Sequence, residues 1–327
     1  MCIFFAASGT RPPLSRVFRG ACAILLAGLL AVGGLPAAAA ASPLATPDTH
    51  AVAQAFLTQM FGQGDMDGAY ERWATSDFIQ HNPEMADGIA GHRAFFAAAA
   101  REPHGDRNAW VHVTDMRLVD GEFFALMHHA FRAPQDPGRM FFDIWRVRNG
   151  RIVEHWDVIQ TIPVDRANPN GMGCGGADYA SARLLGDTLA RPTCGLPDPH
   201  VSRAQTLSII NRYTHEISTS DPRDAIVRWF APDYRQHSPH MADGIQGAID
   251  HLEREYGPTV KVRPSLGTAR IIAEGDLVAE HRLVQYPGTK QPSANVDVFR
   301  VTNAHISEHW DIKQPVPAVT RSGHPMW

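Results

Sequence analysis

Acidic, imidazole and indole side chains recur together at two places in the chain. Asp143 is followed by Glu-His-Trp-Asp at residues 154–157, and Asp297 is followed by the same four residues at 308–311. A carboxyl group enclosed by indole and aliphatic side chains loses solvation, which raises its pKa towards neutrality. With an imidazole nearby, such a group can take up and release protons. The pattern predicts an acid/base site in each half, although a buried Asp that ties two strands together has the same signature.

These recurrences belong to a longer internal repeat. Residues 80–89, Gln-His-Asn-Pro-Glu-Met-Ala-Asp-Gly-Ile, return at 236–245 with two substitutions. Residues 143–157 return at 297–311, so the offset between the copies changes from 156 to 154. A period of this length indicates a duplicated domain and not a solenoid repeat.

Each copy begins with helical patterns and ends with strands. In the first copy, apolar spacing predicts helices near 49–61, 66–74 and 91–101 and strands near 110–119, 123–132, 140–148 and 151–162. In the second copy, the corresponding helices fall near 205–217, 222–230 and 246–256, and the strands near 260–273, 277–286, 295–302 and 305–314. The fold class is therefore predicted as α+β, with three helices of each copy packed on a curved antiparallel sheet.

The remaining segments read as connections. We predict a first domain at 49–163, a linker at 164–200, a second domain at 201–317 and a tail at 318–327. Cys174 and Cys194 both lie in the linker, and an oxidising compartment is expected to join them in a disulfide. Two free thiols without chemistry are the alternative.

The first 41 residues read as a secretory signal peptide. Three arginines precede an apolar run at 21–32, and an alanine-rich segment ending at residue 41 follows. The apolar run is too short for a good membrane span. We therefore expect a secreted or periplasmic protein without a stable membrane span after cleavage.

Charge and motifs exclude several classes of partner. The formal net charge is -4 and no basic stripe is present, so nucleic acid is not expected as a partner. The sequence has no His-x-His or His-Glu-x-x-His motif, no Gly-rich phosphate loop and no Gly-x-Ser-x-Gly elbow. We therefore expect neither a metal nor a cofactor, and the expected ligand is a small apolar molecule.

The Asn149-Gly150 pair sets the expected register of the last hairpin. A two-residue loop places Trp145 opposite Glu154 and Asp143 opposite Trp156. Because side chains alternate between faces, one face then carries Asp143, Trp145, Glu154, Trp156 and Gln160. We interpret this face as the concave wall of a pocket, and the opposite face, with His155 and Asp157, as a solvent or subunit-contact face.

The same reasoning selects histidine partners for the two acids. His281 is expected opposite Asp297, and His129 is expected to reach Asp143 diagonally across the sheet. Asp143 and Asp297 would then act as bases and the two histidines as partner acids.

A further set of residues is assigned to substrate binding. The repeated Gln-His-x-Pro segments place His81 and His237 at the pocket mouth, or else as caps of a neighbouring backbone group. The other members of this set are Trp156, Glu154, Gln160, Trp310, Glu308 and Gln314. For Glu154 and Glu308 a structural role is the favoured interpretation.

Residues 80–83, the following Asp-Gly and residues 143–160 together resemble the SnoaL-like branch of the nuclear-transport-factor-2-like superfamily. The resemblance covers nearly all of both copies, and the closing segment is its most specific part. It implies a cone-shaped α+β half-barrel with a deep apolar pocket. Members and relatives include polyketide cyclases that use aldol chemistry, isomerases, dehydratases, epoxide hydrolases and proteins that only bind, so the fold does not settle the function.

The resemblance also implies residue roles. The acid/base aspartate of the cyclases aligns with Gln160 and, in the second copy, with Gln314. Because glutamine cannot carry a proton, Asp143 and Asp297 would have to supply the chemistry, and the glutamines would orient a substrate oxygen. Family members pair through their sheets, which implies an intrachain pseudo-dimer or a homodimer.

Two functions are compatible with these observations. The first is a cofactor-free acid/base enzyme, an isomerase, dehydratase or aldol-type cyclase, acting on a small apolar carbonyl or hydroxyl compound. The second is a non-catalytic periplasmic protein that binds a small molecule or acts as a scaffold.

Overall fold

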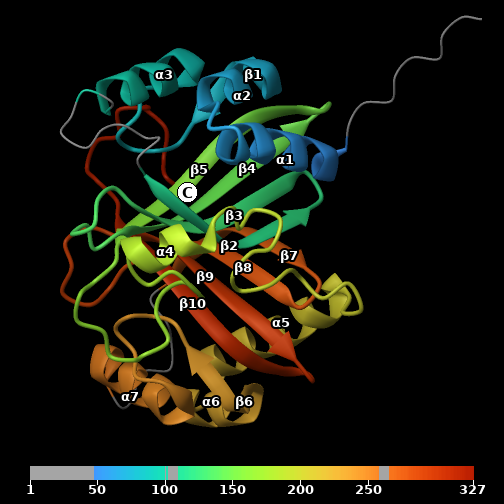
Figure 1. Cartoon of the computed structure of the whole chain (residues 1–327). Coiled ribbons are helices and arrows are strands. Elements are labelled where there is room, and N and C mark those ends of the chain that lie inside the picture. The colour runs from blue at the N-terminus through green and yellow to red at the C-terminus, as the bar shows by residue number, and fades with distance from the viewer. Residues whose placement is uncertain (1–47, 100, 102–109, 258–264) are drawn as a thin grey trace, which may run out of the picture. The chain divides into compact units, whose positions relative to one another are not determined.

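The first copy is an α+β unit in which helices cover one face of a curved sheet (Figure 1). The structure, a computed structural model, describes residues 48–99, 101, 110–257 and 265–327. In chain order the first copy consists of α1 (Thr49–Leu57), a π-helical turn η1 (Thr58–Gly62), α2 (Met66–Trp73), β1 (Ala74–Gln80), α3 (Gly88–Ala99), β2 (Val111–Asp120), β3 (Phe123–Phe131), β4 (Arg139–Arg148) and β5 (Arg151–Thr161).

The second copy repeats this order after a linker that contains the short helix α4 (Tyr179–Leu185). Its elements are α5 (Arg203–Thr219), α6 (Pro222–Trp229), β6 (Phe230–Gln236), α7 (Gly244–Tyr256), β7 (Ser265–Glu274), β8 (Leu277–Val284), β9 (Ser293–Thr302) and β10 (His305–Pro315). The predicted α+β class with two copies is confirmed. Strand β6 was missed, and only a short extended piece at 78–82 was predicted where β1 lies. Residues 260–264 of the strand predicted at 260–273 lie outside the described residues.

Both sheets have five strands in equivalent order, β1-β5-β4-β3-β2 and β6-β10-β9-β8-β7. Strands β2 to β5 form an antiparallel meander, as predicted, but β1 joins the edge of the sheet parallel to β5. The sheet is therefore mixed and not purely antiparallel. In both copies this added strand leads directly into the loop that precedes the third helix.

The hairpin between β4 and β5 turns at Asn149 and Gly150, which have φ values of 50° and 71°. Positive φ at both positions is the signature of the tight turn that the Asn-Gly pair predicts. One pair beyond the turn, Val147 faces Ile152, but the next pair is Arg146 with Glu154. Val153 is therefore an extra residue, a β-bulge, on β5.

This bulge corrects the predicted register. Beyond it, Trp145 faces His155 and Asp143 faces Asp157. Because one inserted residue moves every later side chain to the other face, His155 and Asp157 share the concave face with Asp143. Glu154 and Trp156 lie on the opposite face. The second copy carries the same irregularity, between Ile306 and Glu308.

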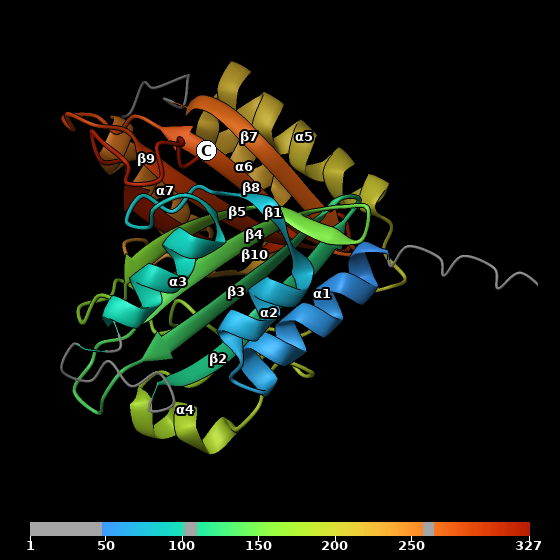
Figure 2. The ribbon, with the colours of Figure 1, turned by 90° about the horizontal axis from the view of Figure 1, so that it is seen from above.

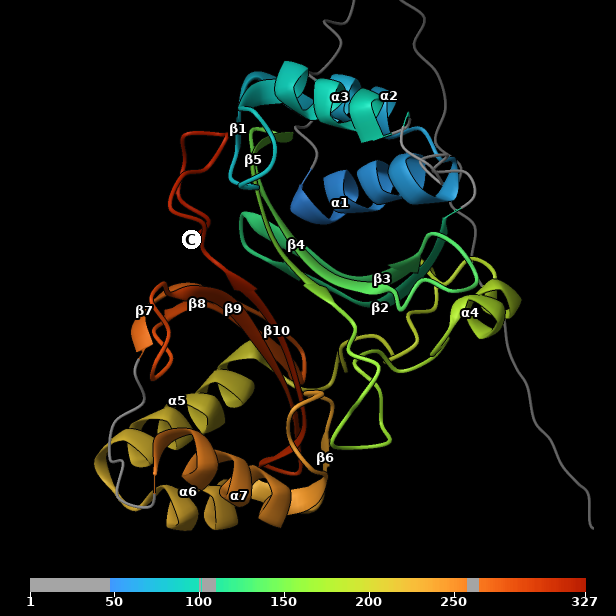
Figure 3. The same ribbon diagram turned by 90° about the vertical axis from the view of Figure 1, so that its left-hand side faces the viewer.

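Three apolar clusters hold the two sheets and their helices together. Phe56, Tyr70 and Trp145 belong to a core between the helices and the concave face of the first sheet, and the second copy has an equivalent core. A third cluster joins the two convex faces and includes Trp156 and Trp310. In Figure 3 each sheet curves around its own helices, and the convex side of each sheet faces the other sheet. Figure 2 gives the view from above.

Export and membrane contact were predicted from the first 41 residues, which lie outside the described residues. Among the helices described, none has the length and apolar character needed to cross a membrane. The predicted disulfide between Cys174 and Cys194 is present in the linker.

Candidate functional site

A cavity of about 240 Å³ lies in the first copy between its helices and the concave face of its sheet. Strands β3, β4 and β5 provide its floor, and α2, η1, α3 and the loop after β1 provide its walls. Its lining is mainly aromatic and apolar, with a small group of titratable side chains. Ligand pockets usually measure roughly 300–1,000 Å³, so this cavity suits a small ligand.

Asp143 lies at the centre of the titratable group. His128 Nε2 donates to Asp143 Oδ2 over 2.9 Å, and His155 Nε2 donates to Asp143 Oδ1 over 3.0 Å. Burial alone would raise the pKa of Asp143, but the two imidazole hydrogen bonds outweigh it and lower that pKa to about 2. Asp143 is therefore an anchored carboxylate and a poor base at neutral pH.

His155 is bound at both of its ring nitrogens. Nε2 meets Asp143, and Nδ1 lies 3.0 Å from Gln80 Oε1. The Gln80 amide is oriented by the Asn82 backbone N–H, which donates to the same Oε1 over 2.8 Å. Both ring nitrogens thus contact oxygen atoms, and these two contacts fix the orientation of the ring.

Asp157 is the second carboxyl group of the cavity. Asn82 Nδ2 donates to its Oδ2 over 2.6 Å, whereas its buried Oδ1 has no hydrogen-bond partner among the described residues. Burial raises the pKa of Asp157, the nearby His155 opposes that effect, the Asp143 charge reinforces it, and the result is a pKa of about 6. Two neighbouring carboxyl groups with separated pKa values are the usual arrangement for acid/base work.

The equivalent residues of the second copy form a different site. His309 binds Asp297 and Gln236 over 3.1 Å each, as His155 binds its partners in the first copy. However, Arg282 takes the place of His128 and ion-pairs with Asp297. Lys313 takes the place of Ile159, and its Nζ lies 3.0 Å from Asp311 Oδ2.

These cations change the titration of the second acid. Burial raises the pKa of Asp311, but the charges of Lys313 and His309 outweigh it and hold that pKa below its usual value. The carboxyl pair of the second copy is therefore neutralised by built-in cations. Of the two carboxyl pairs, only that of the first copy holds an acid poised near neutrality.

Asp143, His155 and Asp157 could also hold a metal ion, since one ligand atom from each lies within 4.8 Å of the others. The sequence predicts no metal because it lacks the usual histidine ligand motifs, and that expectation stays a prediction.

The predicted histidine partners point elsewhere. His128 and not His129 reaches Asp143, because Leu126 lies opposite that acid and His128, two residues further along β3, is on the same face. His129 is on the other face of β3, where its Nδ1 lies 2.6 Å from buried Asp115. Burial lowers the pKa of His129, but the Asp115 charge outweighs it and raises that pKa.

His281 also lies outside any acid pair. Glu280 is opposite Asp297, so His281 falls on the convex face and contacts Arg270 over 3.3 Å. Burial and the Arg270 charge lower the pKa of His281 to about 3. The predicted pairing was wrong by one residue in both copies, and a one-residue shift exchanges the two faces.

His81 and His237 do not line the cavity. Each stacks on the tryptophan of its own copy, His81 on Trp156 at 4.6 Å and His237 on Trp310 at 4.5 Å. Their Nδ1 atoms donate to backbone carbonyls, of Pro325 over 2.7 Å and of Gly171 over 3.0 Å. The alternative interpretation, a histidine that caps a backbone group, therefore describes both.

Each of these carbonyls belongs to the segment that follows one copy and contacts the other copy. The chain that follows the first copy contacts the Gln-His-x-Pro loop of the second, where Ala167 N–H donates to the Pro239 carbonyl over 2.8 Å. The tail that follows the second copy contacts the same loop of the first, where Arg321 N–H donates to the Pro83 carbonyl over 2.8 Å. In each repeated motif the glutamine contacts the histidine on the concave face of its own sheet. The histidine of the motif instead binds the segment that follows the other copy.

The remaining predicted ligand contacts also lie outside the cavity. Glu154 and Glu308 pair with Arg146 and Arg300 over 2.6 and 2.8 Å. Trp156 and Trp310 are in the convex cluster, where Arg270 lies 3.5 Å above the Trp156 ring. Gln160 and Gln314 each accept a backbone N–H group of the opposite copy.

The sequence-based prediction missed His128, His155, Asp157 and Asn82 as cavity residues, and it missed Gln80 as the contact of His155. A signal existed for three of them, because Gln80, His155 and Asp157 all recur in the second copy. Asp157 was placed on the outer face only because the bulge at Val153 leaves no mark in the sequence pattern.

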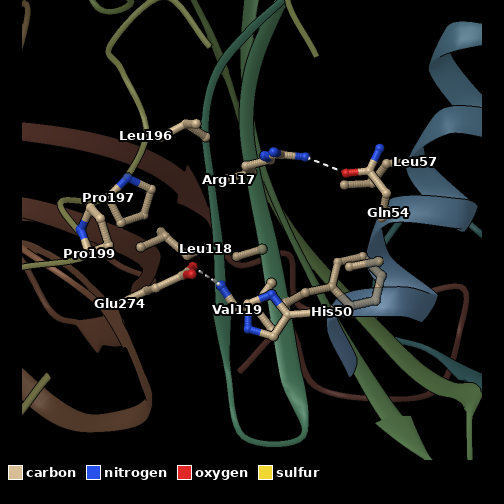
Figure 4. Close-up of a pocket in the computed structure, with 13 residues that line it drawn as sticks. His50, Gln54, Leu57, Arg117, Leu118, Val119, Leu196, Pro197, Pro199 and Glu274 are labelled. Atoms are coloured by element: carbon tan, nitrogen blue, oxygen red, sulfur yellow. Dashed lines mark hydrogen bonds between the residues drawn. The ribbon is translucent and has the colours of Figure 1, made fainter. Parts of the chain in front are cut away.

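A larger depression of about 470 Å³ lies beside β2 and the linker (Figure 4). Three of its polar side chains are already engaged: Arg117 donates to Gln54 over 2.7 Å, and Glu274 accepts the Val119 N–H over 2.6 Å. Its described lining holds no group of convergent acids and imidazoles, so the smaller cavity is the better candidate for chemistry.

Similarity to known proteins is confined to solved structures. No family model matches the chain, and no curated protein sequence is similar to it. An NTF-2-like protein of unknown function from Burkholderia xenovorans LB400 matches with 15% identity, 34% of this chain and 84% of that chain covered, and a TM-score of 0.28. A Jannaschia sp. CCS1 protein assigned as a SnoaL-like polyketide cyclase matches with 17% identity, coverages of 34% and 87%, and a TM-score of 0.29.

IdmH from Streptomyces antibioticus, assigned as a polyketide cyclase, matches with 20% identity, coverages of 34% and 92%, and a TM-score of 0.27. The structures that this chain resembles are thus NTF2-like and SnoaL-like proteins. The identities are low and each match covers about a third of this chain, so these matches carry no argument about its function.

Proposed function

We propose that this protein is an exported, SnoaL-like member of the nuclear-transport-factor-2-like superfamily whose first copy is a cofactor-free acid/base enzyme. The reaction class is proton transfer next to a carbonyl or hydroxyl group of a small, largely apolar compound, as in isomerisation, dehydration or aldol-type closure. The observation that carries the proposal is the carboxyl pair with separated pKa values, about 2 for Asp143 and about 6 for Asp157.

Asp157 is the proton carrier in this proposal. Its Oδ1 is buried and has no partner among the described residues, and its side chain belongs to the cavity lining. A pKa of about 6 leaves most of the carboxyl ionised at pH 7. Asp157 takes a proton from the substrate carbon as a general base, and the protonated form returns it to a different atom. Asn82 keeps the other oxygen in place through the 2.6 Å hydrogen bond.

Tyr70 is the proposed donor to the oxygen that becomes negative. Its hydroxyl accepts a hydrogen bond from Trp145 Nε1 over 3.0 Å, which leaves its own O–H without an acceptor among the described residues. Burial raises the pKa of Tyr70 far above neutrality, and the charges of Asp143 and Asp157 add to that effect, so the O–H stays protonated. A fixed neutral donor of this kind stabilises an enolate or alkoxide in a dry site.

The second copy is proposed to be a structural partner, because Arg282 and Lys313 already neutralise its acids. Export is supported by the disulfide between Cys174 and Cys194, since such bonds persist mainly in oxidising compartments. The non-catalytic alternative, a periplasmic binding protein, would use the same cavity without proton transfer.

Deuterium incorporation into simple carbon acids tests the proposed proton transfer. The full chain is incubated in D₂O with a panel of enolisable aryl ketones, including 1-indanone and 2-tetralone, and incorporation is followed by mass spectrometry. Asp157→Asn should slow incorporation about 100-fold or more, in line with the usual contribution of a positioned base. Asp311→Asn, the matched change in the second copy, should leave the rate unchanged.

Two outcomes count against the enzyme. Incorporation no faster than in buffer across the whole panel would contradict catalysis. Equal rates for wild type and Asp157→Asn would contradict the assigned base. A compound that copurifies with the protein and stays unchanged on incubation would favour the binding alternative.

A further inference from the structure

Arg139 is a cation of the cavity wall that the proposed proton transfer does not use. It lies on the concave face of β4, in the row Arg139, Phe141, Asp143 and Trp145, because alternate residues of a strand share a face. Its side chain lines the cavity and is partly buried. It makes no ion pair or hydrogen bond with any residue in the described part of the chain.

The other charged groups of the lining are accounted for. Arg132 is the nearest comparison, and its Nε donates to Asp136 Oδ2 over 2.7 Å. Asp143 is bound by two imidazoles and Asp157 by Asn82. Glu84 is exposed and raises the pKa of Asp157, so it belongs to the Asp157 end of the cavity. Arg139 is thus a cation in the lining without a described carboxylate partner.

The distance between the Arg139 end and the Asp143 end of the cavity suits a ligand with one small ring system. Arg139 and Asp143 are four residues apart on one strand, which corresponds to roughly 13 Å between their Cα atoms. The long arginine side chain shortens the gap that a ligand must bridge. An anion held by Arg139 would therefore keep its charge away from the carboxylates of Asp143 and Asp157, which lie close together at the other end of the cavity, while its ring extends towards Asp157.

Aromatic groups wall the space between these ends. Phe141 stacks on His128 with ring centroids 4.7 Å apart, and Phe61 meets His128 edge-on at 5.2 Å. Trp110 and His112 also line this part of the cavity. Flat, edge-on and stacked rings of this kind favour a planar aromatic body over a flexible chain.

We propose that the ligand of the first copy is a small aromatic carboxylate, with its carboxylate bound by Arg139 and its ring packed against the aromatic lining to which Phe141, Phe61 and His128 belong. The planar guanidinium matches the two oxygens of a carboxylate, and exclusion of water strengthens the pair. The assignment rests on the proposed function only in naming which end of the ligand reacts; binding at Arg139 needs no turnover.

Paired probes test the anion subsite directly. Binding of 2-naphthoate and of 2-naphthamide, which differ in the charged group, is measured by isothermal titration calorimetry on the full chain. A charge-assisted pair should make the carboxylate bind roughly 10-fold or more tightly than the amide. Arg139→Gln should reduce the preference to less than about twofold.

Arg148→Gln is the matched control, because Arg148 is exposed, pairs with Glu122 and lies on the same strand outside the cavity lining. It should keep the full preference. Equal affinity of the two probes for wild type, no binding of the carboxylate up to millimolar concentration, or an unchanged preference in Arg139→Gln would each overturn the proposal. If the wild type prefers the carboxylate probe but does not catalyse deuterium incorporation, the proposed catalysis is contradicted and the anion subsite stands.

Discussion

The two copies carry the same aspartate at the same place in the fold, with opposite consequences. Asp157 and Asp311 are both buried, and each lies opposite a second aspartate on the neighbouring strand. The pKa of Asp157 is raised by burial to about 6, whereas the charges of Lys313 and His309 together outweigh burial and hold the pKa of Asp311 below its usual value. One side chain, Ile159 in the first copy and Lys313 in the second, accounts for much of this contrast.

The comparison shows which side chains are the same in the two copies and which have changed. The Gln-His-Asp arrangement recurs in both copies, as Gln80, His155 and Asp143 in the first, so it is part of the fold's framework. The residues that decide charge compensation do not recur. Burying a second carboxyl without a cation costs stability, and the first copy retains that cost at its cavity. Strain of this kind is typical of a functional site.

Ile159→Lys should produce the largest effect, because it transfers the second copy's cation to the first. An ammonium beside Asp157 should lower its pKa and weaken it as a base, and deuterium incorporation should fall on the order of 100-fold. The rate of incorporation by the wild type should rise with pH through about 6, as Asp157 ionises, and this rise should be absent in the variant. Ile159→Met, similar in size but uncharged, should retain both the rate and its rise with pH. Full activity in Ile159→Lys would show that the charge at this position does not cause the proposed difference in activity between the copies.

Lys313→Met is the reverse change and should act on stability. It leaves Asp311 buried without its cation, and loss of one partner of a buried pair costs about 3 kcal/mol or more at pH 7.5. The free energy of unfolding is measured by urea titration. Adding Asp311→Asn to Lys313→Met should recover most of the loss, because the uncompensated charge is then gone. A double variant as unstable as the single one would show that Lys313 acts through packing.

Asp157→Asn and Asp311→Asn should have opposite effects on stability. Asp157 has a folded-state pKa raised from 3.8 to about 6, so its ionisation destabilises the fold at pH values above that range. Its removal should stabilise by up to about 3 kcal/mol at pH 8 and have little effect at pH 4 or below. Asp311 has a lowered pKa, so its stabilising contribution exists above pH 4 and is lost in acid.

Thermal unfolding at pH 4 and pH 8 separates the two variants. Asp157→Asn should raise the midpoint at pH 8, and Asp311→Asn should lower it there. Thr75→Ala, a change at a polar side chain of β1 outside the cavity lining, provides a pH-independent reference. Parallel shifts of both aspartate variants with pH would contradict the assigned difference in pKa.

Local signals were sufficient to predict most of the architecture. The Asn149-Gly150 pair predicted the hairpin, and the helix starts follow caps such as Asp48, whose side chain accepts the Ala51 N–H over 2.8 Å. The internal repeat predicted two equivalent units. These features depend on residues close in sequence, or on comparison of the chain with itself.

The site could be predicted only in part, because its geometry depends on single-residue shifts. Val153 adds one residue to β5, and the pairing of β3 with β4 places Leu126 opposite Asp143, so that His128 and not His129 shares the face of that acid. Each shift exchanges the faces of a strand and moves histidines in or out of the cavity. Asp143 was correctly placed on the concave face because it precedes the bulge.

Gln160 and Gln314 show where the two copies remain equivalent. Gln314 Oε1 accepts the Ile159 N–H over 2.7 Å, and Gln160 Oε1 accepts the Lys313 N–H over 2.8 Å. Each glutamine thus binds the strand of the opposite copy, directly behind the position that decides the charge of that copy's acid.

Replacement of either glutamine by alanine should have the smallest effect of the series. Each change leaves a partly buried backbone N–H without its acceptor and should cost about 1 kcal/mol, equally in the two copies, in urea unfolding. Deuterium incorporation should be unchanged in both, since neither side chain lines the cavity. Loss of incorporation in Gln160→Ala but not in Gln314→Ala would contradict this expectation and would show that the convex face of the first sheet, where Gln160 binds Lys313 N–H, contributes to the difference between the copies.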